Sequence, residues 1–352
     1  MNSSDAIAKL MMEVMLVADG PSSEEYATGR FMRPAYEATI GSESFSLENE
    51  PELVSVQVAR NMGLPTDSCE VCIIGGKDYF FNKGDNISVH LGYDDIVKPV
   101  FSGLVESINY ELNKVKVVAL GIAVRLLLLR LNRVYLNQTA GKIVTNIAEE
   151  ANIRVKVASE GINFPSYVID NTANAYEHIL KIAERCNFDA YFTEDEQLMF
   201  KEWEESQNHI LRCGQEVIRI TAFDFSPIYT SAQVYGESPS SVKGSDTYHW
   251  LTKREVKGEA GEGQVLSIHD PAIRDKKTAE TVARSKMERL RYTFGLAVET
   301  VGKPQIKLGD TITLENVPNS TLTGQLEVRG FEHHLSKDKG FTTIINCWKR
   351  SE

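Results

Sequence analysis

The sequence predicts a mainly β protein in which an α+β section separates two β domains that duplicate one another. Three observations indicate this fold class: a stretch that occurs twice, apolar residues with a period of two in both outer parts, and a helical period between them. The repeated stretch is Gly84–Ser88 with Phe101–Glu106, and again Gly309–Thr313 with Leu322–Glu327. Each copy combines a Gly-Asp turn with alternating apolar residues, which predicts strand, loop and strand. We therefore expect Gly103 and Gly324, the glycines of the second block in each copy, to be equivalent positions in space.

The first β domain is expected at residues 29–125, and we expect it to be a barrel or a sandwich. Apolar residues alternate over 36–40, 54–58 and 69–73, with turn residues between these runs. A further strand, Val115–Val118, follows the repeated stretch. Six or more short strands with this spacing are typical of closed or layered β folds.

Helical periodicity follows the leucine run at 126–129, so we expect an α+β domain at residues 126–210. The helix signals are a candidate N-cap at Thr139 for a helix through Ala151, a capping box from Asn174 to Glu177, and a stop at Asn187. A hairpin is expected next, around the charged turn at residues 193–197.

The second β domain is expected in two pieces, residues 211–236 and 300–350, with its first strands at 217–225 and 232–235. Residues 237–299 interrupt the alternation with Gly/Ser-rich runs, and we expect a connecting arm with a helix from about 278 to 292. Residues 1–28 are expected to be an N-terminal helical extension, with an amphipathic helix at 4–19.

Composition limits the function. The chain has 352 residues, room for two or three domains, and its net charge of −11 argues against binding to nucleic acid or to an anionic membrane. It contains no apolar run of membrane-spanning length and no basic signal region before Asp5, so we expect cytosolic synthesis and no stable membrane insertion. The cysteines are five and scattered, which predicts reduced thiols rather than disulfides: Cys69, Cys72, Cys186, Cys213 and Cys347.

The candidate chemical groups are few. Cys69 and Cys72 have the spacing of half a zinc site, but the strand-like alternation around them favours core packing. His333 and His334 are adjacent in a predicted strand and should point to opposite faces, which disfavours chelation of one ion. The acidic turn Glu194–Glu196 is expected to be solvated. Because common hydrolase and phosphate-binding motifs are absent from the sequence, we expect no enzyme activity, catalytic residue, cofactor site or metal site.

Four stretches together resemble a known family in their order and spacing: Tyr135–Val144, Gly161–Asp170, Ala175–Leu180 and Val328–His334. They are similar to the hub protein of contractile phage tails, the late-control gene D family, whose hub part is shared with the VgrG-like spike proteins of type VI secretion. The resemblance covers roughly Pro34 to Trp348. It implies two tandem tail-tube-like β-barrels with an α+β domain between them, and a ring of three chains.

The resemblance also implies a function, that of a structural baseplate hub. Three chains with two equivalent barrels each would present six similar units, so the ring would join a six-fold tail tube to a three-fold spike.

The implied partners are two further copies of the chain, the spike protein, the tail tube protein, baseplate wedge proteins and, as a further candidate, the tape measure protein. DNA would be present only in transit through the lumen. The protein would be made in the host cytoplasm and assembled into a virion tail or a contractile injection particle. Because the sequence stops at Glu352, directly after the last predicted strand, the spike is expected to be a separate polypeptide.

Two alternatives remain open at this point. A peptidoglycan-binding module is one, because Thr139–Ile153 weakly resembles one helix of a LysM repeat, although Asn137-Gln138 replaces the usual Gly-Asp. A tail-tip hydrolase that degrades the cell wall is the other.

Overall fold

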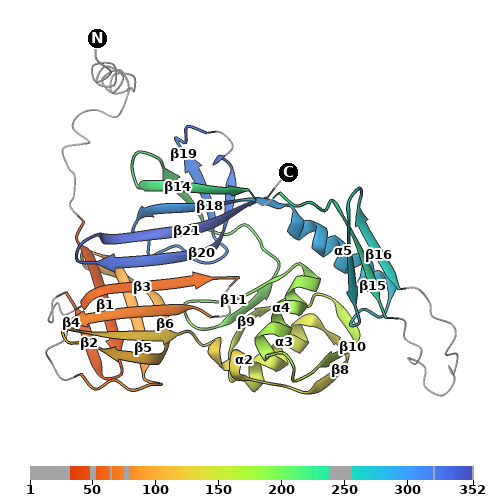
Figure 1. Ribbon diagram of the computed structural model, residues 1–352, viewed down its shortest axis with the longest axis horizontal. Coiled ribbons are helices and arrows are strands. Elements are labelled where there is room, and N and C mark those ends of the chain that lie inside the picture. Colours follow the sequence, from red (N-terminus) through yellow and green to blue (C-terminus); the bar gives the residue numbers. More distant parts are fainter. Residues whose placement is uncertain are drawn as a thin grey trace, which may run out of the picture. The chain divides into compact units, whose positions relative to one another are not determined.

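The computed structural model describes residues 32–47, 53–63, 66–74, 79–224, 226–237, 256–319 and 322–350. Within these ranges the chain is mainly β, with largely antiparallel pairing and helices α2 to α5 (Figure 1). The N-terminal extension expected at residues 1–28, with its helix at 4–19, lies outside the described residues.

The first β section contains seven strands: β1 (Pro34–Ile40), β2 (Glu43–Ser46), β3 (Leu53–Asn61), β4 (Ser68–Ile74), β5 (Asn86–Tyr93), β6 (Ile96–Tyr110) and β7 (Lys114–Leu120). They are hydrogen-bonded in the order β3-β4-β7-β6-β5-β1-β2. The predicted alternation places one face of each strand inside, and Val58, Val71, Val89 and Val117 are fully buried in a shared apolar core.

The middle section is the predicted α+β unit. Its elements are α2 (Val124–Leu128), β8 (Arg133–Thr139), α3 (Ala140–Glu150), β9 (Val155–Ala158), β10 (Asn163–Ile169), α4 (Ala175–Cys186), β11 (Asp189–Phe192) and β12 (Leu198–Lys201). The predicted helix ends are confirmed. The Thr139 side chain accepts a hydrogen bond from the Lys142 amide, the Asn174 side chain accepts one from the Glu177 amide, and Asn187 ends α4 with a φ of 57°.

The second β section contains β13 (Asn208–Arg212), β14 (Val217–Asp224), β18 (Tyr292–Val301), β19 (Thr311–Glu315), β20 (Gln325–Ser336) and β21 (Gly340–Arg350). They are hydrogen-bonded in the order β14-β18-β21-β20-β19-β13. The section is discontinuous in sequence, as expected. Its second piece begins earlier than the expected residue 300, because β18 starts at Tyr292 and pairs with both β14 and β21.

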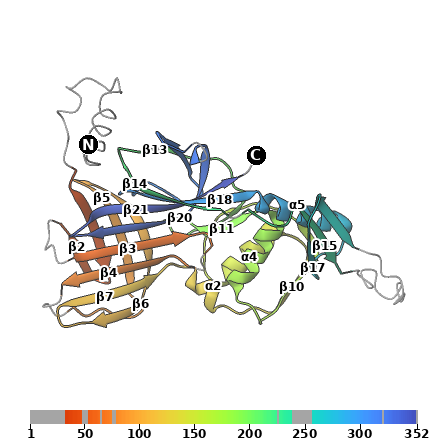
Figure 2. The same cartoon turned by 45° about the horizontal axis from the view of Figure 1, so that its top comes forward.

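The two β sections are joined edge to edge. Residues 330–336 of β20 pair with residues 55–61 of β3, so the described strands of the two β sections form one 13-stranded sheet. Figures 1 and 2 show the blue β20 alongside the orange β3. We expected two separate barrels, but among the described strands the pairing path runs open from β14 to β2 without closing.

The described part of the expected connecting arm, from residue 256 onward, is instead folded. Residues 232–235, assigned from sequence to the second β domain, lie in β15 (Ser231–Gly236), which pairs with β16 (Lys257–Gly261) and β17 (Val265–Asp270). Helix α5 (Lys276–Leu290) covers this small sheet (Figure 2). Its buried face, with Val282 and Ala283, belongs to the same apolar core as α3 and α4. Burial of this face, which the Gly/Ser-rich sequence obscured, makes the segment part of the folded body.

Candidate functional site

The Gly-Asp turn of the first β section has a well-defined geometry. Gly84 has a φ of 91°, a left-handed conformation that favours glycine. Its amide donates to the carbonyl of Val105 at 2.8 Å, and the Val105 amide donates to the carbonyl of Asp85 at 2.9 Å. The Asp85 carboxylate accepts from the amide of Asn82 at 2.8 Å, which fixes the loop before the turn.

The turn of the second β section repeats every one of these bonds. Gly309 has a φ of 84°, its amide donates to Val328 at 2.9 Å, and the Val328 amide donates to Asp310 at 2.8 Å. The Asp310 carboxylate accepts from the amide of Lys307 at 3.0 Å. Asp310 is also held by His209, whose Nε2 lies 2.8 Å from the carboxylate. The two turns therefore share a backbone design, to which the second section adds a histidine contact.

The strand orders of the two sections also correspond. Apart from β2, each strand of the first section has a counterpart at the same position in the hydrogen-bonding order of the second. The pairs of counterparts are β1 and β13, β3 and β14, β4 and β18, β5 and β19, β6 and β20, and β7 and β21. Irregularities recur at matched places, at Val54 in β3 and Ile218 in β14, and at Glu106 in β6 and Arg329 in β20. One difference is that β1 runs antiparallel to β5, whereas β13 runs parallel to β19.

One sequence-based equivalence is wrong. We expected Gly103 and Gly324 to occupy matched positions, but the pairing assigns Gly103 to the position of Leu326. Gly103 pairs with Ile87, and Leu326 pairs with Ile312, the residue three places after the second turn glycine as Ile87 is after the first. The similar letters around the two glycines are displaced by two residues, a shift that preserves the strand face and so is hidden from the apolar pattern.

The junction between β20 and β3 has a buried inner face. Phe331, His333 and Leu335 of β20 lie opposite Arg60, Val58 and Val56 of β3, and all six are buried. The Nδ1 atom of His333 is 2.9 Å from the Thr343 hydroxyl. Burial, together with the positive charge of Arg60, lowers the pKa of His333 to about 3, so this imidazole is neutral.

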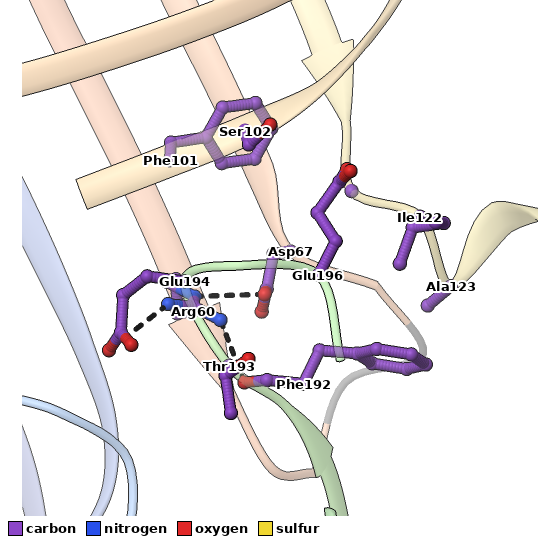
Figure 3. A pocket seen from close by; sticks show the side chains of 11 residues that line it. Arg60, Asp67, Phe101, Ser102, Ile122, Ala123, Phe192, Thr193, Glu194 and Glu196 are labelled. Carbon is purple, nitrogen blue, oxygen red and sulfur yellow. Dashed lines mark hydrogen bonds and ion pairs between the residues drawn. The ribbon is translucent and has the colours of Figure 1, made fainter. Parts of the chain in front are cut away.

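Arg60 also connects the junction to the middle section (Figure 3). Its guanidinium donates to Asp67 at 2.9 Å and to the carbonyl of Phe192 at 2.8 Å, and it lies 3.7 Å from Glu194. Burial raises the pKa of the Asp67 carboxyl, against the opposing effect of Arg60. The pocket around these groups leaves about 10 Å³ for a water-sized sphere, which is room for about one water molecule and not for a substrate.

A second buried arginine connects the middle section to β20. Arg329 makes two hydrogen bonds of 2.8 Å to Asp189 and one of 2.6 Å to Glu327, and its guanidinium lies 4.8 Å from the centre of the Trp348 ring. Burial raises the pKa of Glu327, opposed by Arg329. Because a bidentate arginine fixes the relative orientation of two backbones, this cluster and Arg60 hold the β sections in place on the α+β unit.

A larger cleft of about 370 Å³ lies where β6, the acidic turn and the loop before Lys307 meet. Its half-buried carboxylate, that of Glu194, is already paired with Arg60 and with Lys307 at 3.3 Å. We expected the whole acidic turn to be solvated, and this is wrong for Glu194 and Glu196, which are half-buried; only Asp195 is exposed. The ion pairs explain why a charged turn can pack against the rest of the protein.

The other candidate residues have structural surroundings. Cys69 and Cys72 are buried free thiols, and burial raises the pKa of both. His333 and His334 point to opposite faces, as predicted: His334 is partly exposed and lies 3.3 Å from Glu332. No group of three or more His, Cys, Asp or Glu side chains with metal-binding geometry occurs among the described residues.

Two further features bear on the alternatives. The helix that weakly resembles a LysM element is α3, and its apolar face, with Ile143, Val144 and Ile147, is fully buried in the core. A helix packed in this way presents only its other face to a ligand. None of the described helices is long and apolar enough to cross a membrane.

Comparisons with known proteins identify the fold. The structure is similar to the 43 kDa tail protein of prophage MuSo2 from Shewanella oneidensis, with a TM-score of 0.68 and 12% identity over 89% of this chain and 98% of that one. A tail protein from Neisseria meningitidis MC58 matches equally well, with a TM-score of 0.68 and 12% identity over 90% and 96% of the two chains. The fold is that of these tail proteins.

A third solved structure is consistent with this fold assignment, whereas the two comparisons of sequence do not add to it. The Escherichia coli c3393 protein, described as a component of the type VI secretion system similar in structure to the phage T4 tail proteins gp27 and gp5, matches with a TM-score of 0.60 and 11% identity over 90% of this chain and 77% of that one. A family described as the Alg8 N-terminal domain matches residues 74–242, slightly less than half of the sequence. A search of curated proteins finds no match.

Sequence reasoning missed the two buried arginines and the β20–β3 junction. Arg329 and Asp189 are 140 residues apart, and no local pattern links them. One signal was present: His333 is a polar residue that shares a strand face with Phe331 and Leu335, which predicts a buried partner elsewhere in the chain.

Proposed function

We propose that the chain is a structural hub of a contractile tail or injection apparatus, in which three copies form a pseudo-six-fold ring that joins a six-fold tube to a three-fold spike. The observation that carries the proposal is the correspondence of the two β sections, in strand order, irregularities and the bonds of the Gly-Asp turn. Two equivalent units per chain match six-fold symmetry when three chains close a ring.

The fold supports the same proposal, because the similar solved structures are described as tail proteins and as a type VI secretion component. Under the proposal the partners are two further copies, the spike, the tube and neighbouring baseplate proteins, and the chain has no catalytic role. The ion-paired and filled surroundings of Arg60 and Arg329 are consistent with a part that holds its shape under load.

Light scattering on the purified chain, alone and mixed with the spike protein of the same apparatus, tests the proposal. We expect particles of three chains in at least the mixture. A chain that stays monomeric in both samples would contradict the hub function. Incubation with purified peptidoglycan, followed by sedimentation and assay of released sugars, serves as the control for the cell-wall alternatives, and we expect neither binding nor release.

A further inference from the structure

The internal β20–β3 junction has an unpaired counterpart in two strand edges, that of β14 and that of the last part of β6. Strand β14 takes the place of β3 in the second section, and apart from a single bridge at Val217 it pairs only with β18 among the described strands. Strand β6 takes the place of β20, and β5 covers its edge only as far as Leu104. The second half of β20 uses the corresponding edge to bind β3.

We propose that β14 of one chain pairs antiparallel with the end of β6 in a second copy of the chain, and so repeats the internal junction between molecules. The inference rests on the proposed function for the number of copies in the ring, but the pairing itself follows from the two matched edges. The matched irregularities set the register of the proposed pairing. Counted from them, Tyr110 of β6 corresponds to His333 of β20, and Ala222 of β14 corresponds to Val58 of β3. Because His333 lies opposite Val58, Tyr110 should lie opposite Ala222, and the next pair should be Glu111 opposite Thr221.

Exposure of the two edges supports this partner. At the internal junction His333 and Val58 are fully buried, whereas at the free ends Tyr110 is 59% exposed and Ala222 is exposed. Leu112, at the tip of the β6–β7 hairpin, is 95% exposed, while its counterpart Leu335 is buried. Apolar residues at an unpaired strand edge favour the addition of another strand. A second copy supplies a complementary edge, because each chain carries one of each kind.

The contact is head-to-tail, and this has a consequence for assembly. A heterologous contact produces either a closed ring or an open filament, depending on the rotation that it applies. If the β14–β6 pairing between chains copies the β20–β3 pairing within a chain, every β section is related to the next by the same rotation. Junctions within a chain and junctions between chains then alternate around the assembly. The hairpin after β6 turns at Leu112 and Asn113, before the point where β20 ends, so the outer ladder is shorter than the inner one.

Disulfide trapping in the full chain tests the pairing. In a Cys213→Ser background, which leaves only buried native thiols, Glu111→Cys is combined with Thr221→Cys. Facing residues of an antiparallel pair lie about 4.5 to 5.5 Å apart between Cα atoms, within the range that a disulfide bridges. The matched positive control is Gln57→Cys with His334→Cys, the corresponding pair at the internal junction. The negative control is Glu111→Cys with Ala222→Cys, whose side chains should point to opposite faces.

We expect mild oxidation to link Glu111→Cys/Thr221→Cys chains covalently up to trimers on a non-reducing gel, with reduction restoring single chains. The internal pair should link within one chain, and the negative control should stay unlinked. Trimers in light scattering without this link, while the internal pair does link, would overturn the proposed pairing and leave the hub function intact. Links that extend beyond three chains would support the pairing and contradict the ring of three. A chain that stays monomeric and unlinked would contradict both.

Discussion

His333 is an imidazole fully enclosed at the junction of the two β sections, between Phe331 and Phe341. Its pKa is lowered to about 3, whereas a histidine in the unfolded chain titrates near 6.5. Between these values the unfolded state binds one more proton than the folded state, so stability falls as the pH falls. The contribution is fully present above about pH 6.5 and is lost progressively toward pH 3.

This predicts a specific pH dependence. Between pH 7 and pH 5 the titration of His333 should cost the wild-type protein about 2 kcal/mol of unfolding free energy. His333→Asn, which keeps a hydrogen-bonding group near Thr343, should lose most of this dependence, as measured by urea unfolding at both pH values. His334→Asn, on the opposite and partly exposed face, is the control and should behave like the wild type. Equal pH dependence in the wild type and His333→Asn would show that another group is responsible.

Arg329 gives a second prediction at this scale. Arg329→Met removes the cation that pairs with Asp189 and Glu327 and leaves two buried carboxylates together, which should destabilise the fold by about 3 to 5 kcal/mol. Arg219→Met, which removes an exposed ion pair with Glu299, should cost no more than about 1 kcal/mol. Denaturant titration of both variants compares them. Similar small losses would mean that the Arg329 cluster contributes little to holding β20.

At the scale of elements, the sequence predicted local features well and long-range ones poorly. The helix caps at Thr139 and Asn174 and the Gly-Asp turns were predictable because each depends on residues close in the chain. The β20–β3 pairing was not, because it depends on edges far apart in sequence. The segment with β16, β17 and α5 was mistaken for an arm because its strands are short and lie close to glycine-rich turns, and because it packs on a core shared with other segments.

Gly103, in β6, and Gly324, just before β20, now predict different outcomes. An added Cβ at Gly103 would lie 2.3 Å from the Leu120 carbonyl oxygen, so Gly103→Ala should clash with backbone and cost about 2 to 3 kcal/mol. At Gly324 the nearest atoms belong to the flexible Lys349 side chain, but the φ of 113° is strained for alanine, so Gly324→Ala should cost about 1 kcal/mol. Thermal melts would rank them, and a larger loss for Gly324→Ala would contradict the positions assigned here.

At the scale of the whole molecule, the order of elements and the tail-protein fold could be predicted from the repeated turn and the family resemblance. The open pairing path, found in place of the two expected barrels, could not be predicted, because closure depends on which edges meet, and the described strands leave β14 and the end of β6 open. Those open ends are what an assembling subunit needs, since an edge strand is costly to expose unless a partner covers it.

The central claim is that the two β sections are equivalent units of one ring. Electron cryo-microscopy of the assembled protein, reconstructed without imposed symmetry, tests it most directly. The account predicts six β units at steps of about 60° around the axis, alternating between the section with β3 to β7 and the section with β14 and β18 to β21. A particle in which these two sections lie at different radii, or in which three chains meet through the α+β units alone, would contradict it.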